Sequence, residues 1–231
     1  MLKRLSEAEA DGDRIWAVIR GSAVNHGGAS TGLTAPNTPA LEEVIETALS
    51  EGGISPLYVD YLEAHGTGTT VGDPIENDAV ASVYGRGRKA DRPLLIGSVK
   101  TNIGHLEPAA GVASLVKTVL AMKRGVIPRN LHFSEPSPHV DWDSLPVRVV
   151  SANTDRPPRA GVSAFGVSGT NAHVVVEDYA PEDASRNDAD PVPAGAACFV
   201  DVSPPEPIAD LAVPENNVCQ ARKTRFLACS C

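Results

Sequence analysis

The sequence is poor in aromatic residues, and it contains no long apolar run. Only 4% of its 231 residues are Phe, Trp or Tyr, so a core would consist mainly of aliphatic side chains packed closely with the help of glycine. The longest apolar helix candidate, residues 112–122, contains Lys117 and is too short to cross a bilayer. These deficits predict a chain with no membrane-spanning segment, long enough for one or two globular domains.

Cysteine and positive charge are also scarce. The four cysteines have neither the spacing of a disulfide framework nor that of a paired zinc motif; they are Cys198, Cys219, Cys229 and Cys231. A formal charge of −9 argues against a nucleic-acid or anionic-membrane surface, and ordinary solubility explains it equally well. The N-terminus is charged and has no apolar h-region typical of a secretory signal. We therefore expect a cytoplasmic protein with no nucleic-acid partner and no membrane association.

What the chain does contain is an alternation of strand and helix patterns. Buried strands are predicted over residues 15–24, 58–62, 94–98, 147–150, 160–163 and 172–177. Thr38 and Asp73, each followed by proline, predict two helix N-termini. A third helix would present five apolar residues on one face, namely Val112, Leu115, Val116, Val119 and Leu120. This alternation predicts a layered α/β domain.

The composition changes after about Tyr179. Residues 179–231 are rich in Pro, Asp and Ala and lack apolar periodicity, which is typical of a poorly ordered linker. We therefore divide the chain into an N-terminal segment (1–13), an α/β region (14–178) and a linker (179–231).

Two of the six histidines lie in unusual surroundings. His65 and His105 each follow a predicted strand, within turns rich in Gly, Thr and Asn where ligands can approach the backbone closely. Two imidazoles held on short turns could stabilise negative charge that develops on a substrate. The opposing interpretation is that such histidines are structural, as we expect for His173, which alternates with valines on a predicted strand.

Three other kinds of site fit the sequence less well. Zinc held by both histidines with Glu63 or Asp73 lacks the short HxH or HExxH spacing, so no metal is expected. The segment GSVKT lacks the glycine pattern of a phosphate-binding loop. Gly166-Val167-Ser168-Gly169 does not match the GxSxG turn of serine hydrolases.

Three motifs, in order and with their spacing, resemble the C-terminal half of a β-ketoacyl synthase, especially the ketosynthase domain of type I polyketide synthases. They are EAHGTGT, KTNIGH and GVSAFGVSGTNAH, and the likeness extends from about Arg14 to Glu177. The tail resembles the start of the linker that leads to an acyltransferase domain. The resemblance implies a thiolase-like layered fold, of which this chain would contain only the C-terminal half.

The resemblance also implies a reaction. An acyl group passes from the phosphopantetheine of an acyl carrier protein to a cysteine, and a malonyl-type extender loses carbon dioxide and attacks the acyl thioester. His65 and His105 would bind the thioester oxygen, and Lys100 would organise the pair. Thr67 and Thr69 would contact the pantetheine arm, and the backbone N–H of Val167 would form part of an oxyanion hole.

One departure from the family concerns activity. The family's nucleophilic cysteine precedes both histidines, whereas every cysteine here follows them. We expect the chain alone to be inactive, to bind no cofactor of its own, and to need a missing N-terminal half. The other implied partners are an acyl carrier protein and a second copy in a homodimer. The alternative is a non-catalytic remnant or a module that binds carrier protein.

Overall fold

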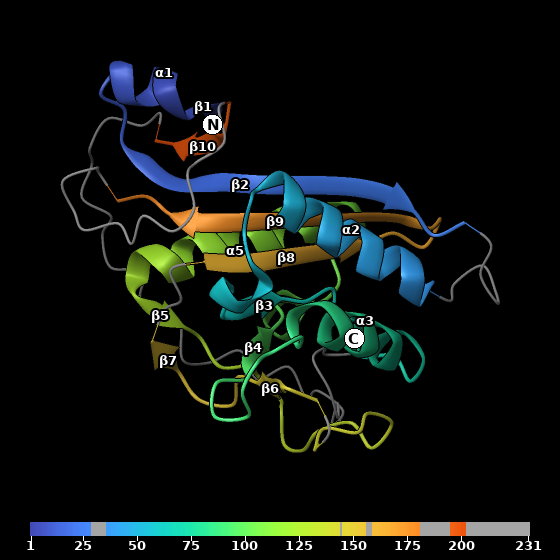
Figure 1. Cartoon of the computed structure of the whole chain (residues 1–231). Coiled ribbons are helices and arrows are strands. Elements are labelled where there is room, and N and C mark those ends of the chain that lie inside the picture. The colour runs from blue at the N-terminus through green and yellow to red at the C-terminus, as the bar shows by residue number, and fades with distance from the viewer. Residues whose placement is uncertain (29–35, 144, 156–158, 181–194, 202–231) are drawn as a thin grey trace.

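The computed structural model describes residues 1–28, 36–143, 145–155, 159–180 and 195–201, and its main feature is an eight-stranded mixed sheet (Figure 1). The strands lie in the order β1-β10-β2-β9-β8-β3-β4-β6. Their bounds are β1 (Leu2–Arg4), β2 (Ile15–His26), β3 (Tyr61–Glu63), β4 (Leu94–Gly97), β6 (Val147–Val149), β8 (Arg159–Phe165), β9 (Thr170–Asp178) and β10 (Ala197–Val200). β5 (Val126–Ile127) and β7 (Thr154–Asp155) pair separately.

The direction of the strands determines where the loops meet. β3 is parallel to both of its neighbours, β8 and β4, and β4 is parallel to β6. β8, β9 and β2 pair antiparallel to one another. Because β3 and β4 are adjacent and parallel, the loops that follow them leave the same edge of the sheet.

Helices cover both faces of the sheet. α2 (Thr38–Glu51) and α3 (Gly72–Tyr84) pack on one face, and α5 (Ala110–Arg124) lies on the other (Figure 1). Successive strand residues accordingly enter different cores: Leu62 packs with α2 and α3, and Tyr61 packs with α5. The remaining short helices are α1 (Leu5–Ala10), α4 (Lys100–Ile103), η1 (Pro56–Tyr58) and η2 (Glu107–Ala109). The predicted layered α/β fold is confirmed.

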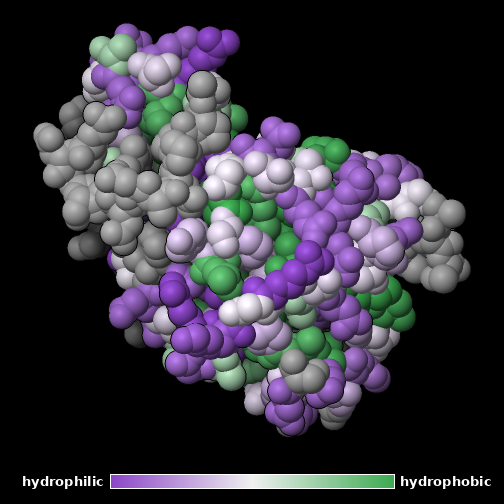
Figure 2. All heavy atoms as spheres, viewed as in Figure 1, coloured by the Kyte–Doolittle hydropathy of each residue, from purple (hydrophilic) through white to green (hydrophobic). Residues whose placement is uncertain are grey.

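The cores are largely aliphatic, as the scarcity of aromatic residues led us to expect. Leu41, Val44 and Ile45 of α2 are almost completely buried against the sheet. Close packing requires Gly21 on β2, because a Cβ there would lie 2.1 Å from the carbonyl oxygen of Ala48. Outside this core, the surface formed over α2 and α3 is mostly hydrophilic, with apolar side chains in small groups (Figure 2).

The predicted helix over the apolar run forms as α5, but the five apolar residues predicted for one face divide: Val119 and Leu115 pack on the core, whereas three others face outward. Val112 is 65% exposed, Val116 51% and Leu120 44%. The buried side of α5 combines Val119 and Met122 with small residues such as Ser114 and Thr118. Thr118 Oγ1 donates a hydrogen bond to the carbonyl of Ser114. We call the exposed strip of Val112, Val116 and Leu120 the outer face of α5. Because α5 carries apolar residues around most of its circumference, periodicity alone could not indicate which side meets the sheet.

A small third core joins the two ends of the described chain. β10 pairs with β1 on one side and β2 on the other, and Cys198 packs there with Leu5 and Val18. β10 lies within the predicted linker, whose residues 181–194 and 202–231 are outside the described part, as are the three terminal cysteines. The division at residues 13/14 and 178/179 stays a prediction. No helix within the described residues is long and apolar enough to cross a membrane.

Candidate active site

The two histidines singled out in the sequence lie side by side. His65 follows β3, and His105 follows α4, which begins just after β4. Their ring centroids are 5.3 Å apart, and the ring planes meet at 85°. Since β3 and β4 are adjacent parallel strands, the sheet brings together two loops that are forty residues apart in sequence.

The hydrogen bonds of the two rings determine where each carries its proton. Nδ1 of His65 accepts from the N–H of Phe165 at 3.3 Å, and Nδ1 of His105 accepts from the N–H of Glu107 at 3.1 Å. A neutral imidazole that accepts at Nδ1 must carry its proton on Nε2. Both rings therefore present an Nε2–H donor.

Electrostatics keep the two rings neutral. Burial, and after it the charges of Lys100 and His105, lower the pKa of His65 to about 3. The pKa of His105 is also lowered, first by burial and then by Lys100. At neutral pH the pair therefore acts as hydrogen-bond donors that carry no full charge.

Lys100 begins α4 and lies close enough to both histidines for its charge to lower their pKa values. Lys100 is only 1% exposed. Burial lowers the pKa of its ammonium group, while the charges of Glu76, Glu63 and Asp73 raise it. No carboxylate among the described residues lies within the 4 Å of an ion pair with its ammonium group. Lys100 thus supplies positive potential to the site without a direct carboxylate partner in that part of the chain.

Two acidic residues near the start of α3, which begins where the sequence predicted a helix, also hold the His65 loop. The carboxylate of Glu76 accepts hydrogen bonds from the N–H groups of His65 and Gly66, both at 2.8 Å. Asp73 accepts from the N–H of Gly68 at 3.1 Å. Burial raises the pKa of both carboxyls, that of Asp73 to about 8. α3 therefore positions His65 through backbone contacts that motif spacing did not reveal.

The turn that carries Lys100 and His105 is held by side chains from elsewhere. The N–H of Ser98 donates to Oδ1 of Asn130 at 3.1 Å, and the N–H of Val99 donates to Oε1 of Glu63. Asn130 is 2% exposed, and no motif in the sequence pointed to it.

A cavity of about 410 Å³ opens in front of the histidines. Both rings line it, and so do Thr67, Thr69 and Val167, whereas Lys100 lies outside the lining. Val167 is 68% exposed. The sequence analysis did not single out three further lining residues, His26, Asn37 and Asn171. Of these, His26 accepts from the N–H of Gly28 at 3.0 Å and lies 2.9 Å from the carbonyl of Ser168.

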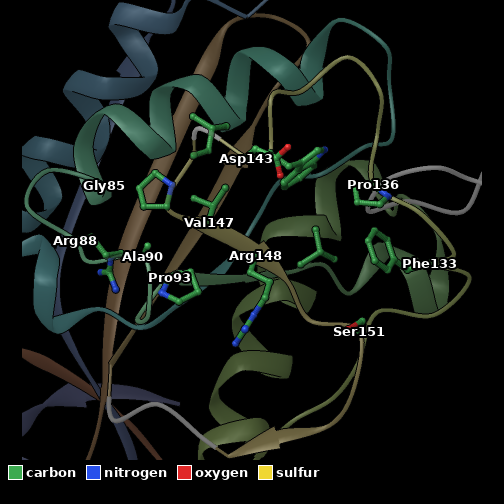
Figure 3. Close-up of a pocket in the computed structure, with 14 residues that line it drawn as sticks. Gly85, Arg88, Ala90, Pro93, Phe133, Pro136, Asp143, Val147, Arg148 and Ser151 are labelled. Carbon is green, nitrogen blue, oxygen red and sulfur yellow. The ribbon is translucent and has the colours of Figure 1, made fainter.

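A larger cavity, of about 790 Å³, lies beside β6 (Figure 3). Phe133, Trp142 and several prolines line it, and none of its described lining residues is a histidine or a cysteine. Its Arg88 is already bound, at 2.6 Å to the carbonyl of Val59 and in an ion pair with Asp60. No group of three or more His, Cys, Asp or Glu side chains in the described part is arranged to hold a metal ion. The candidate site is therefore the cavity at the histidine pair.

Comparison with known proteins shows the family to which the chain belongs. The family model of the β-ketoacyl synthase C-terminal domain matches residues 16–134, and that of the ketoacyl-synthetase C-terminal extension matches residues 136–199. The chain is 55% identical over 201 residues to the spectinabilin polyketide synthase system protein NorB of Streptomyces orinoci, covering 85% of this chain and 9% of the relative. It is 54% identical over 202 residues to erythronolide synthase EryA2 of Saccharopolyspora erythraea, covering 84% and 6%.

Solved structures of ketosynthases are also similar to the chain. The oxazolomycin ketosynthase domain OzmH KS7 of Streptomyces albus JA3453 has a TM-score of 0.72 and 42% identity, covering 78% of this chain and 34% of that one. The ketosynthase from module 6 of the bacillaene synthase of Bacillus subtilis 168 has a TM-score of 0.72 and 40% identity, covering 78% and 33%. The chain thus spans about a third of these ketosynthases and no more than a tenth of the curated relatives named above.

The fold and the neighbours define the class as a layered α/β domain of the thiolase-like kind. Within that class, the chain belongs to the β-ketoacyl synthase family and carries the C-terminal domain found in type I polyketide synthases.

Proposed function

We propose that this chain supplies the charge-stabilising part of a ketosynthase site for decarboxylative condensation. The observation that carries the proposal is the pair of neutral imidazoles, 5.3 Å apart, with both Nδ1 atoms engaged by backbone N–H groups. Their Nε2–H groups are donors toward an oxygen that gains negative charge. Preorganised donors in a partly buried site stabilise such charge more strongly than water does.

In the proposed reaction, the bond between the α-carbon and the carboxylate of a malonyl-type thioester breaks, and carbon dioxide leaves. The electron pair passes into an enolate whose negative charge lies on the thioester oxygen. His65 and His105 donate hydrogen bonds to that oxygen, and the nearby Lys100 adds positive potential. The enolate carbon then attacks an acyl thioester, forming the new carbon–carbon bond and releasing a thiolate.

Other residues of the cavity have supporting roles in this proposal. The extender is carried on the phosphopantetheine of an acyl carrier protein, and Thr67 and Thr69 offer hydroxyls to that arm. Both threonines line the cavity, with their Oγ1 atoms 3.5 Å apart. The backbone N–H of Val167 donates to the oxygen of the acyl thioester, which agrees with the location of Val167 at the cavity wall.

The acyl-bearing cysteine comes from the remainder of the ketosynthase. Cys198 is buried in the third core and is not among the cavity's lining residues. The outer face of α5 supports the proposal that a partner region is missing, because its three large apolar residues are 44 to 65% exposed. Since the chain spans only 34% of a similar ketosynthase, that remainder covers the outer face of α5 in the proposed assembly. A homodimer of the assembled enzyme remains part of the proposal.

Co-expression with a complementary N-terminal ketosynthase region tests this function. We expect a complex that forms a β-ketoacyl product on carrier protein and that decarboxylates a malonyl thioester. A folded complex that lacks both activities would contradict the proposal and favour a non-catalytic carrier-binding module.

In the active complex, His65→Ala should lower the rate of decarboxylation about 10²- to 10³-fold, the loss typical of removing one such donor. His139→Ala is the control, because His139 is exposed and is not among the cavity's lining residues. Equal rates for the two variants would remove the role assigned to His65.

A further inference from the structure

A lysine of α5 contacts the strand that leads to His65, on the face of the sheet that α5 covers. Nζ of Lys117 lies 2.7 Å from Oε2 of Glu63 and 2.9 Å from the hydroxyl of Tyr61. The Tyr61 hydroxyl in turn donates to Oε2 of Glu63 at 2.6 Å. Glu63 is completely buried, and the side chain of Lys117 is only 12% exposed. The three side chains form a closed hydrogen-bonded cluster.

The other oxygen of Glu63 leads to the site. Oε1 accepts the N–H of Val99, the residue directly before Lys100 and α4. Glu63 thus bonds at one end to α5 and at the other to the turn that carries Lys100 and His105. His65 lies only two residues after Glu63, so the same carboxylate lies between the two loops that present the histidines.

The charge of this cluster makes the turn depend on Lys117. A buried carboxylate is costly unless it is paired and hydrogen-bonded. Lys117 provides the one ion pair of Glu63 within the described residues. Lys117 also borders the apolar groove at the outer face of α5, so the region that we propose to cover that face also shields the pair from water.

We propose that Lys117, Tyr61 and Glu63 form a positioning cluster that holds the turn of Lys100 and His105 in place beside His65. The cluster touches no reacting atom. Its catalytic consequence rests on the proposed function, whereas its effect on the turn does not.

Amide hydrogen exchange, followed by NMR in the full chain, tests the effect on the turn. In Lys117→Met the amide of Val99 should exchange at least tenfold faster relative to the amide of Val175, a fully buried residue of β9 that reports overall opening. The control is Lys123→Met, on the same helix, which removes the surface ion pair with Asp178. An unchanged ratio of Val99 to Val175 exchange in Lys117→Met would overturn the proposal.

Tyr61→Phe keeps the test decisive if Lys117→Met does not fold. This variant preserves the ion pair and removes one hydroxyl from the cluster. We expect Val99 to exchange about threefold or more faster relative to Val175, and an unchanged ratio would again overturn the proposal.

Kinetics of the assembled ketosynthase test the consequence. Lys117→Met should lower kcat at least tenfold with KM within about twofold, and Lys117→Arg should recover part of the loss. Faster Val99 exchange with unchanged kcat would contradict the proposed role of the turn in catalysis, while the cluster itself would stand. Unchanged exchange would reject the cluster whatever the kinetics.

Discussion

At the scale of single residues, the site depends on keeping two imidazoles neutral while each donates from Nε2. A protonated ring would have to donate from Nδ1 as well, and Nδ1 of each ring faces a backbone N–H, of Phe165 or of Glu107. Burial and the nearby Lys100 both oppose protonation of His65. In the proposed function, the same lysine stabilises the developing anion and keeps the donors in the neutral form that binds it.

Lys100→Met should raise the pKa of both His65 and His105. Removing the ammonium charge removes one cause of the lowered pKa, while burial, which is the larger cause, remains. His65 should therefore still titrate below the ordinary histidine value of about 6.5. NMR titration of the imidazole C–H signals measures the change, with exposed Lys89→Met as the control.

Two results would contradict this prediction. In one, neither histidine shifts in Lys100→Met. In the other, His65 of the wild-type chain titrates near 6.5, which would mean that its ring is not buried as described.

At the scale of elements, local hydrogen bonding decides where helices begin. The sequence indicated Thr38 as the N-cap of α2, but Asn37 is the cap, and its side chain accepts from the N–H of Ala40 at 3.3 Å. The Asn37 amide also donates to the carbonyl of Gly27 at 2.9 Å, which ties the helix to the loop beside the cavity. A contact of this kind depends on the tertiary fold.

Asn37→Ala should lower the free energy of unfolding by about 1 kcal/mol, the usual cost of losing an N-cap. Thr38→Ala is the matched control and should change it by less than about 0.5 kcal/mol. Urea denaturation of the two variants and the wild type measures both values. An equal loss for the two would mean that Thr38 shares the capping role.

The two sides of α5 should respond differently to substitution. Val116→Lys on the outer face should change the free energy of unfolding of the isolated chain by less than about 0.5 kcal/mol, because Val116 is 51% exposed. Met122→Ala on the inner side should cost about 2 to 5 kcal/mol, because Met122 is 1% exposed. Urea denaturation measures both, and a large loss for Val116→Lys would show that its face is packed within this chain.

At the scale of the whole molecule, buried neutral histidines link stability to pH. His173 is fully buried between the hydroxyls of Tyr84, at 2.7 Å, and Ser163, at 2.9 Å, and burial lowers its pKa to about 3. As pH falls below about 6.5, the unfolded chain binds a proton at this residue before the folded chain does. The stabilising contribution is therefore present above pH 6.5 and is lost as pH falls toward 3.

His173→Gln should be less stable than the wild type at pH 7, and the difference should shrink with acid. The expected slope is about 1.4 kcal/mol per pH unit between roughly pH 6 and 4. Urea denaturation at pH 7, 6 and 5 measures it. A difference that stays constant with pH would mean that the pKa of His173 is the same in the folded and unfolded chains.

Much of the architecture could be predicted because it depends on local patterns. Alternation along β2 and β9, and the helical spacing of Leu41, Val44 and Ile45 in α2, reflect which residues must leave water. The contact between Lys117 and Glu63 could not be predicted, because 54 residues separate them. A lysine within an apolar helix does not by itself indicate which residue it contacts. The roles of Asn130 and Glu76 could not be predicted for the same reason, since each accepts a hydrogen bond from the backbone of a distant loop.

The sequence by itself determined the family, the order of the six central strands and three long helices, and the two glycine-rich turns that carry His65 and His105, because each depends on residues that are neighbours along the chain. Only the tertiary structure decided that the two rings meet at 5.3 Å, which Nε2–H groups they present and which side of α5 faces outward. These features arise from parallel pairing of β3 with β4 and from packing against the sheet. Both bring together residues that are far apart in the sequence, and no local pattern indicates that they meet.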